Sequence, residues 1–203
     1  MSAFGDDIFE PGSISQVELD VYTSDYRVSG TISTRFGRVT DILNQVSSSH
    51  IPLVRATTSE YDDPASTLAA EHVHVSVDEI LFCVASTDGE ARPDMRIAKR
   101  PVRAQMAVPP FRLTGTVHVT VGSRPVDGLL NAADRFMAMT EVTVSCARHP
   151  ELGRTAKALA VQRRRAHVLL VADDERPDEL LAEVLDERTA SDWLVSREPR
   201  SEG

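Results

Sequence analysis

The sequence predicts a mainly β protein made of two tandem repeats, each with the order β-β-short α-β-β-β and each forming a small barrel or half-barrel, followed by a C-terminal amphipathic helix. Residues 26–43, YRVSGTISTRFGRVTDIL, return 85 positions later as residues 111–129, FRLTGTVHVTVGSRPVDGL. Short runs of alternating apolar and polar residues, separated by turns, are typical of half-buried strands. The acidic residues concentrate in 173–203, so that segment is distinct from the repeats.

The positions shared by the repeats are of structural types. Gly30 aligns with Gly115, and a glycine in mid-strand is tolerated where the backbone bends or another segment comes close. We therefore expect a bend at both. Asp41 aligns with Asp127 where a short helix should begin, so each is expected to cap that helix, with Asn44 closing its other end.

The first repeat (17–86) follows a mobile N-terminal arm (1–16). Its expected elements are strands at 17–23 and 26–34, a short helix at 39–46, and strands at 53–61, 72–77 and 80–85. The polar connection Ser24-Asp25 predicts a hairpin between the first two strands, and Asp78-Glu79 predicts another between the last two.

The second repeat (102–172) follows a polar linker (87–101) that has no periodicity. Its expected elements are strands at 102–108 and 111–121, a helix at 126–133, and strands at 136–147, 156–162 and 167–172. Arg163-Arg164-Arg165 would join the last two strands as a hairpin.

Composition limits the possible environments of the chain. It has 203 residues, 41% of them hydrophobic, and a net charge of −9 that lies mostly in 173–203, so the repeats are nearly neutral. No apolar run approaches the roughly 20 residues that span a bilayer, and the first residues do not resemble a signal peptide. We expect a cytoplasmic protein without membrane insertion. Cys83 and Cys146 lie in apolar strands and should be buried as small hydrophobic residues.

Both terminal segments carry apolar side chains that could bind a partner. The arm contains Phe4, Ile8 and Phe9, and the tail contains Leu180, Leu181, Val184, Leu185 and Trp193. The four aliphatic tail residues would form one stripe on a helix at about 177–188. Either group could dock on another protein or pack back on the body of the chain.

No pattern predicts catalysis, a cofactor or a metal site. The sequence contains no nucleophile elbow, phosphate loop, dinucleotide fingerprint or zinc-finger spacing. His72 and His74 would share one face of a strand and could hold a metal together, but the second repeat has no matching pair. We interpret them as a polar strand face and expect a non-enzymatic protein.

The charged corners of the repeats differ in sign. Asp78 and Glu79 in the first repeat correspond to Arg163, Arg164 and Arg165 in the second. Opposite charges at equivalent corners could direct head-to-tail or heteromeric assembly. Nucleic-acid binding is less favoured, because only 5% of residues are aromatic and none alternates with the basic clusters.

The segment GTISTRFGRVTDILN, followed by HIPLVRAT, resembles an uncharacterised bacterial domain that is similar in outline to small SH3-like or Sm-like barrels. The resemblance implies a small-barrel fold over most of both repeats and no particular activity. The expected helix lies between strands two and three, whereas Sm proteins begin with a helix, so the resemblance implies neither ring formation nor RNA binding.

Three functions are compatible with these features. We favour a protein-interaction or scaffold subunit of a larger cytoplasmic assembly, with a protein partner or self-association. The first alternative is a small-ligand or nucleotide sensor that binds between the repeats near Arg35, Arg38 and Arg124. The second is an RNA-binding small-barrel protein.

Overall fold

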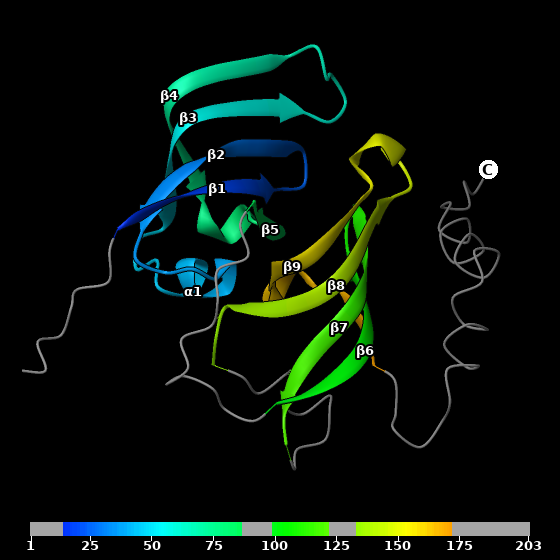
Figure 1. The fold of residues 1–203 in the computed structure, drawn as a ribbon. Coiled ribbons are helices and arrows are strands. Elements are labelled where there is room, and N and C mark those ends of the chain that lie inside the picture. Colours follow the sequence, from blue (N-terminus) through cyan, green and yellow to red (C-terminus); the bar gives the residue numbers. More distant parts are fainter. Residues whose placement is uncertain (1–13, 87–98, 122–132, 172–203) are drawn as a thin grey trace, which may run out of the picture.

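The protein is mainly β, as predicted. The computed structural model describes residues 14–86, 99–121 and 133–171, and the strands within them form one ten-stranded antiparallel sheet (Figure 1). The elements are β1 (Ser15–Tyr22), β2 (Tyr26–Thr34), α1 (Val39–Asn44), β3 (His50–Glu60), β4 (Thr67–Ser76), the 3-10 helix η1 (Val77–Glu79), β5 (Phe82–Ala85), β6 (Lys99–Val108), β7 (Phe111–Thr120), β8 (Phe136–Cys146), η3 (Pro150–Leu152), β9 (Arg154–Gln162), η4 (Arg163–Arg165) and β10 (Val168–Val171).

We call residues 14–86 the first half and residues 99–171 the second half. Strands β1 and β6 begin slightly earlier than expected, within the segments predicted as arm and linker. The rest of the arm and linker, the expected second helix and the acidic tail lie outside the described residues.

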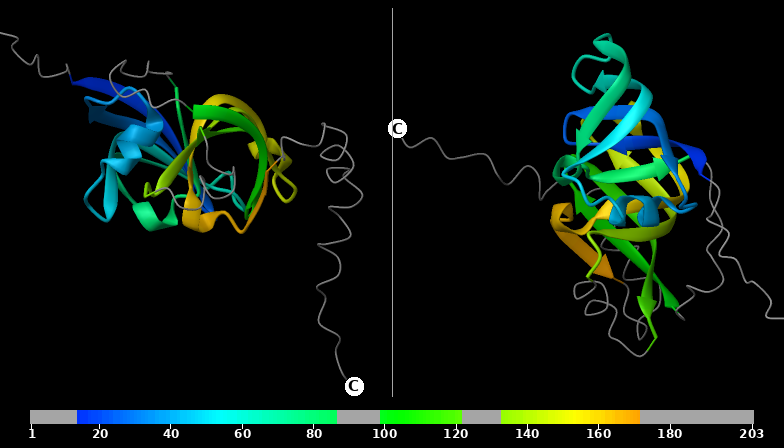
Figure 2. Two further views of the ribbon diagram at one scale, coloured as in Figure 1. Left: turned by 90° about the horizontal axis from the view of Figure 1, so that it is seen from below. Right: turned by 90° about the vertical axis from the view of Figure 1, so that its left-hand side faces the viewer.

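The sheet has the strand order β10-β6-β7-β8-β9-β5-β1-β2-β3-β4. Each half therefore has the same internal order: its fifth strand, then its first, second, third and fourth. The two halves join where β9 lies beside β5. Figure 2 shows the strands of the second half curving around their core. Because the sheet is open and continuous, the expectation that each repeat forms a small barrel or half-barrel is not confirmed.

The predicted hairpin between β1 and β2 is present, with Tyr22 opposite Arg27. The prediction that each half ends in a hairpin is wrong. Strand β5 pairs with β1 and β9, and β10 pairs with β6. The 3-10 turns η1 and η4 carry the chain across to the first strand of each half, where Leu81 N donates to Tyr22 O and His167 N donates to Ala107 O, both at 2.8 Å.

Both mid-strand glycines lie at irregularities of the sheet, as predicted. The register between β2 and β3 shifts at Gly30, and the register between β7 and β8 shifts at Gly115. The facing strands contain Arg55 and Glu141, whose φ angles are 48° and 49°. These are the extra residues of two matching bulges, which bend the strand.

Glycine is required at these bulges because the facing strand comes close. A Cβ atom on Gly30 would lie 2.9 Å from the Cβ of Ala56, and one on Gly115 would lie 2.9 Å from the carbonyl oxygen of Thr140. Both contacts are shorter than side-chain packing allows.

The two halves share their cores. One buried cluster combines Tyr22 and Phe82 of the first half with residues of β6 to β9. The other combines the first-half core with Phe136 and Ala160. Cys83 and Cys146 are buried, as predicted. Burial raises the pKa of the Cys83 thiol, so this side chain behaves as a small hydrophobic group.

Helix α1 begins at Val39 as predicted but ends at Asn44, two residues earlier than expected. Its N-cap is Arg38, without a side-chain hydrogen bond, and Asp41 lies inside the first turn. The prediction that Asp41 caps the helix is therefore wrong, because Asp41 is a residue of the helix itself; Asp127 lies outside the described residues. Asn44 does not close the helix by a side-chain bond but contacts the second half: its side chain donates to Phe136 O at 3.0 Å and accepts from Phe136 N at 2.8 Å.

Replacing either bulge glycine should destabilise the fold. We expect Gly30→Ala and Gly115→Ala each to lower the free energy of unfolding by about 1–3 kcal/mol, because the added methyl group overpacks against the facing strand. Urea unfolding followed by circular dichroism measures this. The control is Ser33→Ala, an exposed position of the same strand as Gly30, which should change stability by less than about 0.5 kcal/mol. Equal stability of the alanine variants and the wild type would contradict the packing argument.

Candidate protein-interaction site

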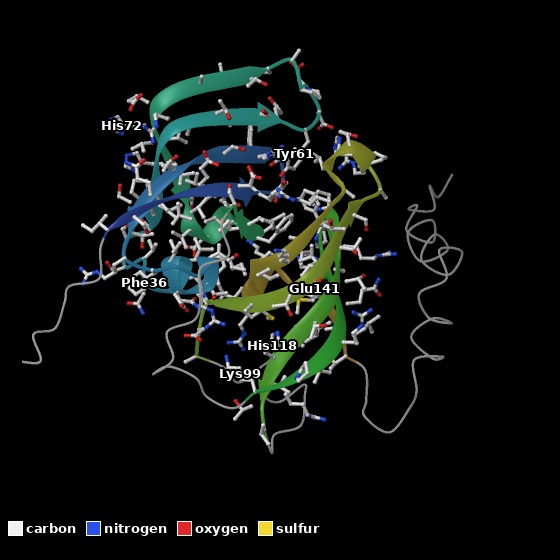
Figure 3. All side chains as sticks on the ribbon, in the orientation of Figure 1. Phe36, Tyr61, His72, Lys99, His118 and Glu141 are labelled. Carbon is white, nitrogen blue, oxygen red and sulfur yellow. The ribbon has the colours of Figure 1, made fainter. Side chains whose placement is uncertain are left out.

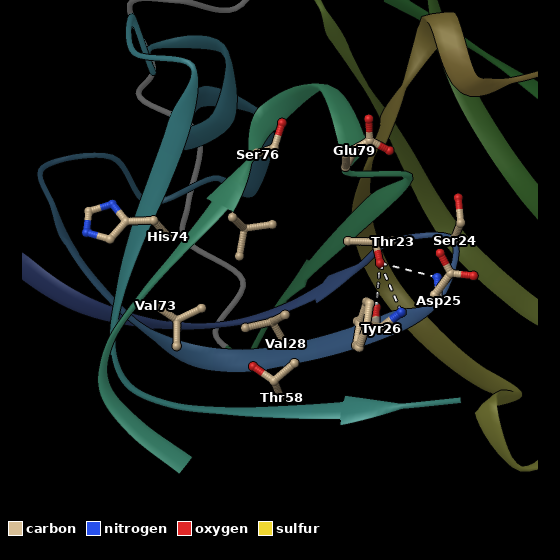
Figure 4. A pocket seen from close by; sticks show the side chains of 11 residues that line it. Thr23, Ser24, Asp25, Tyr26, Val28, Thr58, Val73, His74, Ser76 and Glu79 are labelled. Carbon is tan, nitrogen blue, oxygen red and sulfur yellow. Dashed lines mark hydrogen bonds between the residues drawn. The ribbon is translucent and has the colours of Figure 1, made fainter. Parts of the chain in front are cut away.

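A groove lies beside β4, the last strand at one end of the sheet (Figure 4). Its volume is about 350 Å³. It is bounded by the turn between β1 and β2, by β3, by β4 and by η1, and is lined by Thr23, Ser24, Asp25, Tyr26, Val28, Thr58, Val73, His74, Val75, Ser76 and Glu79. We call it the β4 groove. Its floor is apolar and its rim is polar, which suits an extended segment that carries an apolar side chain.

The turn at the rim of the β4 groove is held by a compact set of hydrogen bonds. Thr23 N donates to Tyr26 O at 2.9 Å, and Tyr26 N donates to Thr23 Oγ1 at 3.0 Å. Tyr61 Oη donates to Tyr26 O at 2.7 Å. Burial raises the pKa of Tyr61, so the phenol keeps the proton that it donates. The groove wall is therefore held by hydrogen bonds within the chain itself.

The second half has the same groove, and there it is filled. Val28 pairs with Thr58 in the first half as Leu113 pairs with Val144 in the second. By this register, the groove residues Tyr26, Val28, Thr58, Val73 and Val75 correspond to Phe111, Leu113, Val144, Leu159 and Val161. All five second-half residues are buried. In the first half, Val28 and Val75 are also buried, but Thr58 and Val73 are partly exposed and Tyr26 is 42% exposed.

Aromatic side chains of the first half fill this second-half groove. The Phe82 ring lies edge-on to Phe111 at 5.0 Å between centroids, and Tyr22 stacks on Phe82 at 4.4 Å. Tyr61, labelled in Figure 3, also meets Phe111 edge-on at 5.7 Å. Such contacts add to the gain from burying the rings.

Backbone pairing accompanies the filling of the second-half groove. Phe82 lies opposite Val161 and Cys83 opposite Ala160, so β5 extends the sheet beyond β9. Gln162 N donates to Leu81 O at 2.9 Å at the end of this pairing. We call the contact of β5 with β9, together with the filled groove, the internal joint.

The outer edge of β4 has no such neighbour among the described residues. Val77 N donates to Ser49 O, toward β3. Because successive N–H groups of a strand point to opposite sides, Ser76 N points away from β3. Ser76 occupies the position that Gln162 has in the second half. Leu68, on the same strand, is 69% exposed. The β4 edge and its groove are thus open where the second half is occupied.

A partly buried ionic network fixes the internal joint. Asp20 accepts hydrogen bonds from Ser29 at 2.6 Å, from Arg27 at 3.0 Å and from Arg154 of the second half at 2.7 Å. Arg154 also donates to Tyr22 Oη at 3.0 Å. Burial by itself would raise the pKa of Asp20, but the bonds from Ser29, Arg154 and Arg27 outweigh it and lower that pKa. The sequence analysis missed both Asp20 and Arg154, because nothing local links residues so far apart.

The charged corners predicted from the sequence meet within the chain. Arg165 donates to Asp78 O at 2.8 and 2.6 Å and forms an ion pair with Glu79 at 2.6 Å. Arg163 donates to Asp134 O, and Arg164 is exposed. Three of the five predicted charged residues therefore bind one another at the internal joint.

The region between the halves is packed rather than hollow where Tyr22, Phe82 and Phe111 meet. Arg35 and Arg38, predicted as ligand contacts, are exposed, and Arg124 lies outside the described residues.

Lys99 and Arg38 lie near His118 at the end of β7. Burial, together with the charges of Lys99 and Arg38, lowers the pKa of His118, whose Nε2 lies 2.8 Å from Thr140 Oγ1. His118 and Lys99 are labelled in Figure 3.

The remaining predicted site residues either lie outside the described residues or are exposed on β4. Phe4, Ile8 and Phe9 of the arm and Leu180, Leu181, Val184, Leu185 and Trp193 of the tail lie outside the described residues. His72 and His74 are exposed on β4. Within 14–86, 99–121 and 133–171, no three His, Cys, Asp or Glu side chains gather as a metal site would require. No helix in these ranges is long and apolar enough to cross a membrane.

Comparison with known proteins gives no match: no family model, no curated protein and no solved structure is significantly similar to this chain.

The Asp20 network predicts a pH-dependent stability. We expect Asp20→Asn to lower the free energy of unfolding by about 1.5–3 kcal/mol near neutral pH, because charge-assisted hydrogen bonds are lost. The lowered pKa of Asp20 means that its contribution is complete above the unfolded-state value and is lost as the pH falls through the folded-state value. The difference between variant and wild type should therefore shrink in acid.

Urea unfolding is compared at about pH 7 and about pH 2, because the lowered pKa of Asp20 keeps its carboxylate at least partly charged at pH values nearer the unfolded-state pKa of about 3.9. Glu18→Gln is the matched control, since Glu18 is an exposed carboxylate on the same strand. A destabilisation by Asp20→Asn that is the same at both pH values would show that the network does not depend on the carboxylate charge.

Proposed function

We propose that this protein is a non-enzymatic protein-interaction or scaffold subunit of a larger assembly, and that it binds a partner by adding an extended segment to the β4 edge. One observation supports this above the others. The corresponding groove in the second half holds an added strand, β5, with the Phe82 ring in the groove. The chain thus contains an occupied example of the site that it leaves open at β4.

The chemistry of the β4 edge suits strand addition. Backbone groups along the open edge provide hydrogen bonds that do not depend on the partner's sequence, while the groove selects an apolar side chain. Val28, Thr58 and Val73 gather beside the open strand in Figure 4, whereas the His74 ring points away from them. A strand added here would place alternate side chains in the groove and toward His74.

The affinity of a single added strand should be moderate. The groove holds about 350 Å³, so it accepts one or two side chains, and the contact is smaller than a standard interface. A dissociation constant on the order of 1–100 μM corresponds to the few favourable contacts available. Such an affinity suits a subunit that contributes one of several contacts in an assembly.

A peptide that copies β5 should bind the β4 edge. The probe is a fluorescent peptide of residues 79–86, EILFCVAS, with Cys83 replaced by Ser, and fluorescence anisotropy with the full chain measures binding. We expect Ser76→Pro to weaken binding at least about tenfold, because proline removes the outward N–H and blocks pairing. Ser76 has φ −60°, which proline adopts without strain.

Ser76→Ala is the matched control, since it keeps the N–H group and should bind like the wild type. Chemical-shift changes in the amides of β4 would place the peptide at the edge. If the peptide binds equally well to Ser76→Pro, or does not bind the wild type, the proposed use of the edge is wrong.

The sensor alternative, with its ligand near Arg35, Arg38 and Arg124, is supported by one observation: a second cation, Lys99, lies close to Arg38, since both charges act on His118. A nucleotide or another anion bound there would stabilise the fold by mass action. Thermal unfolding with and without ATP measures this, and Lys99→Glu should abolish any shift. A labelled single-stranded RNA in the same assay tests the RNA-binding alternative. An unchanged melting temperature with millimolar ligand would contradict both.

A further inference from the structure

We propose that the partner at the β4 edge is a second copy of this chain, and that β10 of one copy adds to β4 of the next. This inference rests on the proposed use of the β4 edge and names its occupant. The resulting contact would be head to tail and would continue the sheet from copy to copy.

The internal joint provides the geometry of this contact. It places the fourth strand of the second half, β9, beside the fifth strand of the first half, β5. The two strands that end the sheet are β4, the fourth strand of the first half, and β10, the fifth strand of the second. The ends are therefore the same two kinds of edge that already pair inside the chain. A contact between different surfaces can repeat and gives a ring or an extended array.

The equivalence of the halves also fixes the register. Val161 and Ala160 pair with Phe82 and Cys83 inside the chain. Their counterparts on the open edges place Val75 opposite Val168 and His74 opposite Leu169 of the next copy.

The backbone groups at the end of this pairing also match. Gln162 N donates to Leu81 O in the internal joint, so Ser76 N should donate to His167 O between copies. His167 is already held like Leu81, because the N–H of each bonds to the first strand of its own half.

Charges alternate favourably along such an array. At the internal joint, the basic corner of η4 contacts the acidic corner of η1 through Arg165 and Glu79. Between copies, the acidic corner beside β4 would face the basic corner that precedes β10 in the next copy. Glu79 lines the β4 groove and would then lie near the exposed Arg164 of that copy, while its ion pair with Arg165 stays within each chain. Each contact brings opposite charges together, which favours the correct partner and orientation.

The joint between copies should be weaker than the internal joint. Ala107 takes the position of Tyr22, so less apolar surface enters the β4 groove. On the other face of the sheet, His50 and His74 take the positions of the buried Phe136 and Ala160. The exposed Leu68 takes the position of Arg154, so the ionic network has no counterpart. These differences predict reversible, concentration-dependent association.

Sedimentation of the full chain between about 10 μM and about 1 mM tests the association, since this range includes the dissociation constants typical of weak interfaces. We expect the average mass to rise with concentration. Ser76→Pro and Arg164→Glu should each weaken association at least about threefold, whereas the controls Ser76→Ala and Arg164→Lys should behave like the wild type. A chain that stays monomeric over the whole range would overturn the inference.

A disulfide tests the register directly. The double variant His74→Cys with Leu169→Cys should form intermolecular disulfides under mild oxidation, seen as a ladder or a covalent ring on a non-reducing gel. The control His72→Cys with Leu169→Cys is two residues out of register and should cross-link at least about fivefold less. Equal cross-linking of the two pairs would overturn the register, and no cross-linking by folded protein of either pair would overturn the contact.

The peptide experiment separates this inference from the proposed function. If the peptide of residues 79–86 binds at β4 while the chain stays monomeric, the edge binds another protein or the chain's own terminal segments, and only the second-copy inference fails. If neither peptide binding nor self-association occurs, both proposals fail. If both occur and Ser76→Pro weakens both, the second copy is the occupant of the β4 edge.

Discussion

The structure depends on the insertion of Tyr22 and Phe82 into the groove of the second half. Burying two aromatic side chains removes on the order of 300–500 Å² from water, which at about 25 cal/mol per Å² stabilises the fold by several kcal/mol. Both rings lie in the core cluster that contains most of the second half. Without this burial, the pairing of β5 with β9 would lose most of its apolar contacts. The two similar halves would then not be held together as one sheet.

This insertion also makes the two halves unequal. Equivalent strands have the same pairing and matching bulges, but only one of the two grooves is filled. The residues around the filled groove are larger and more apolar, as the pairs Thr58 and Val144 or Val73 and Leu159 show. The open groove keeps smaller and more polar residues, which is the expected composition of a surface that spends part of its time in water.

Much of the fold could be predicted from the sequence, but its connections could not. The alternation of apolar and polar residues predicted the strands, and the repeated glycines predicted the bends at the bulges, because both signals are local in the sequence. Periodicity says which face of a strand is buried and not which strand is its neighbour, so β5 was expected to pair with β4 instead of with β1 and β9. Asp20 and Arg154 were missed, and Asn44 was assigned the wrong role, for the same reason: their partners are distant in sequence. The one sequence signal for the groove was that the two halves carry different residues at the groove positions. These positions can be matched between the halves only once the strand register is known.

An open strand edge normally invites aggregation, and β4 limits this by its composition. Its outward face carries the exposed His72 and His74 next to the charged Glu71, and polar edges of this kind disfavour random pairing. The groove face of the same strand is apolar at Val73 and Val75. An incoming strand must therefore offer apolar side chains on one face and tolerate polar ones on the other, in a register set by the turn at η1. Under the proposed function, these combined requirements would make the β4 edge selective for its partner.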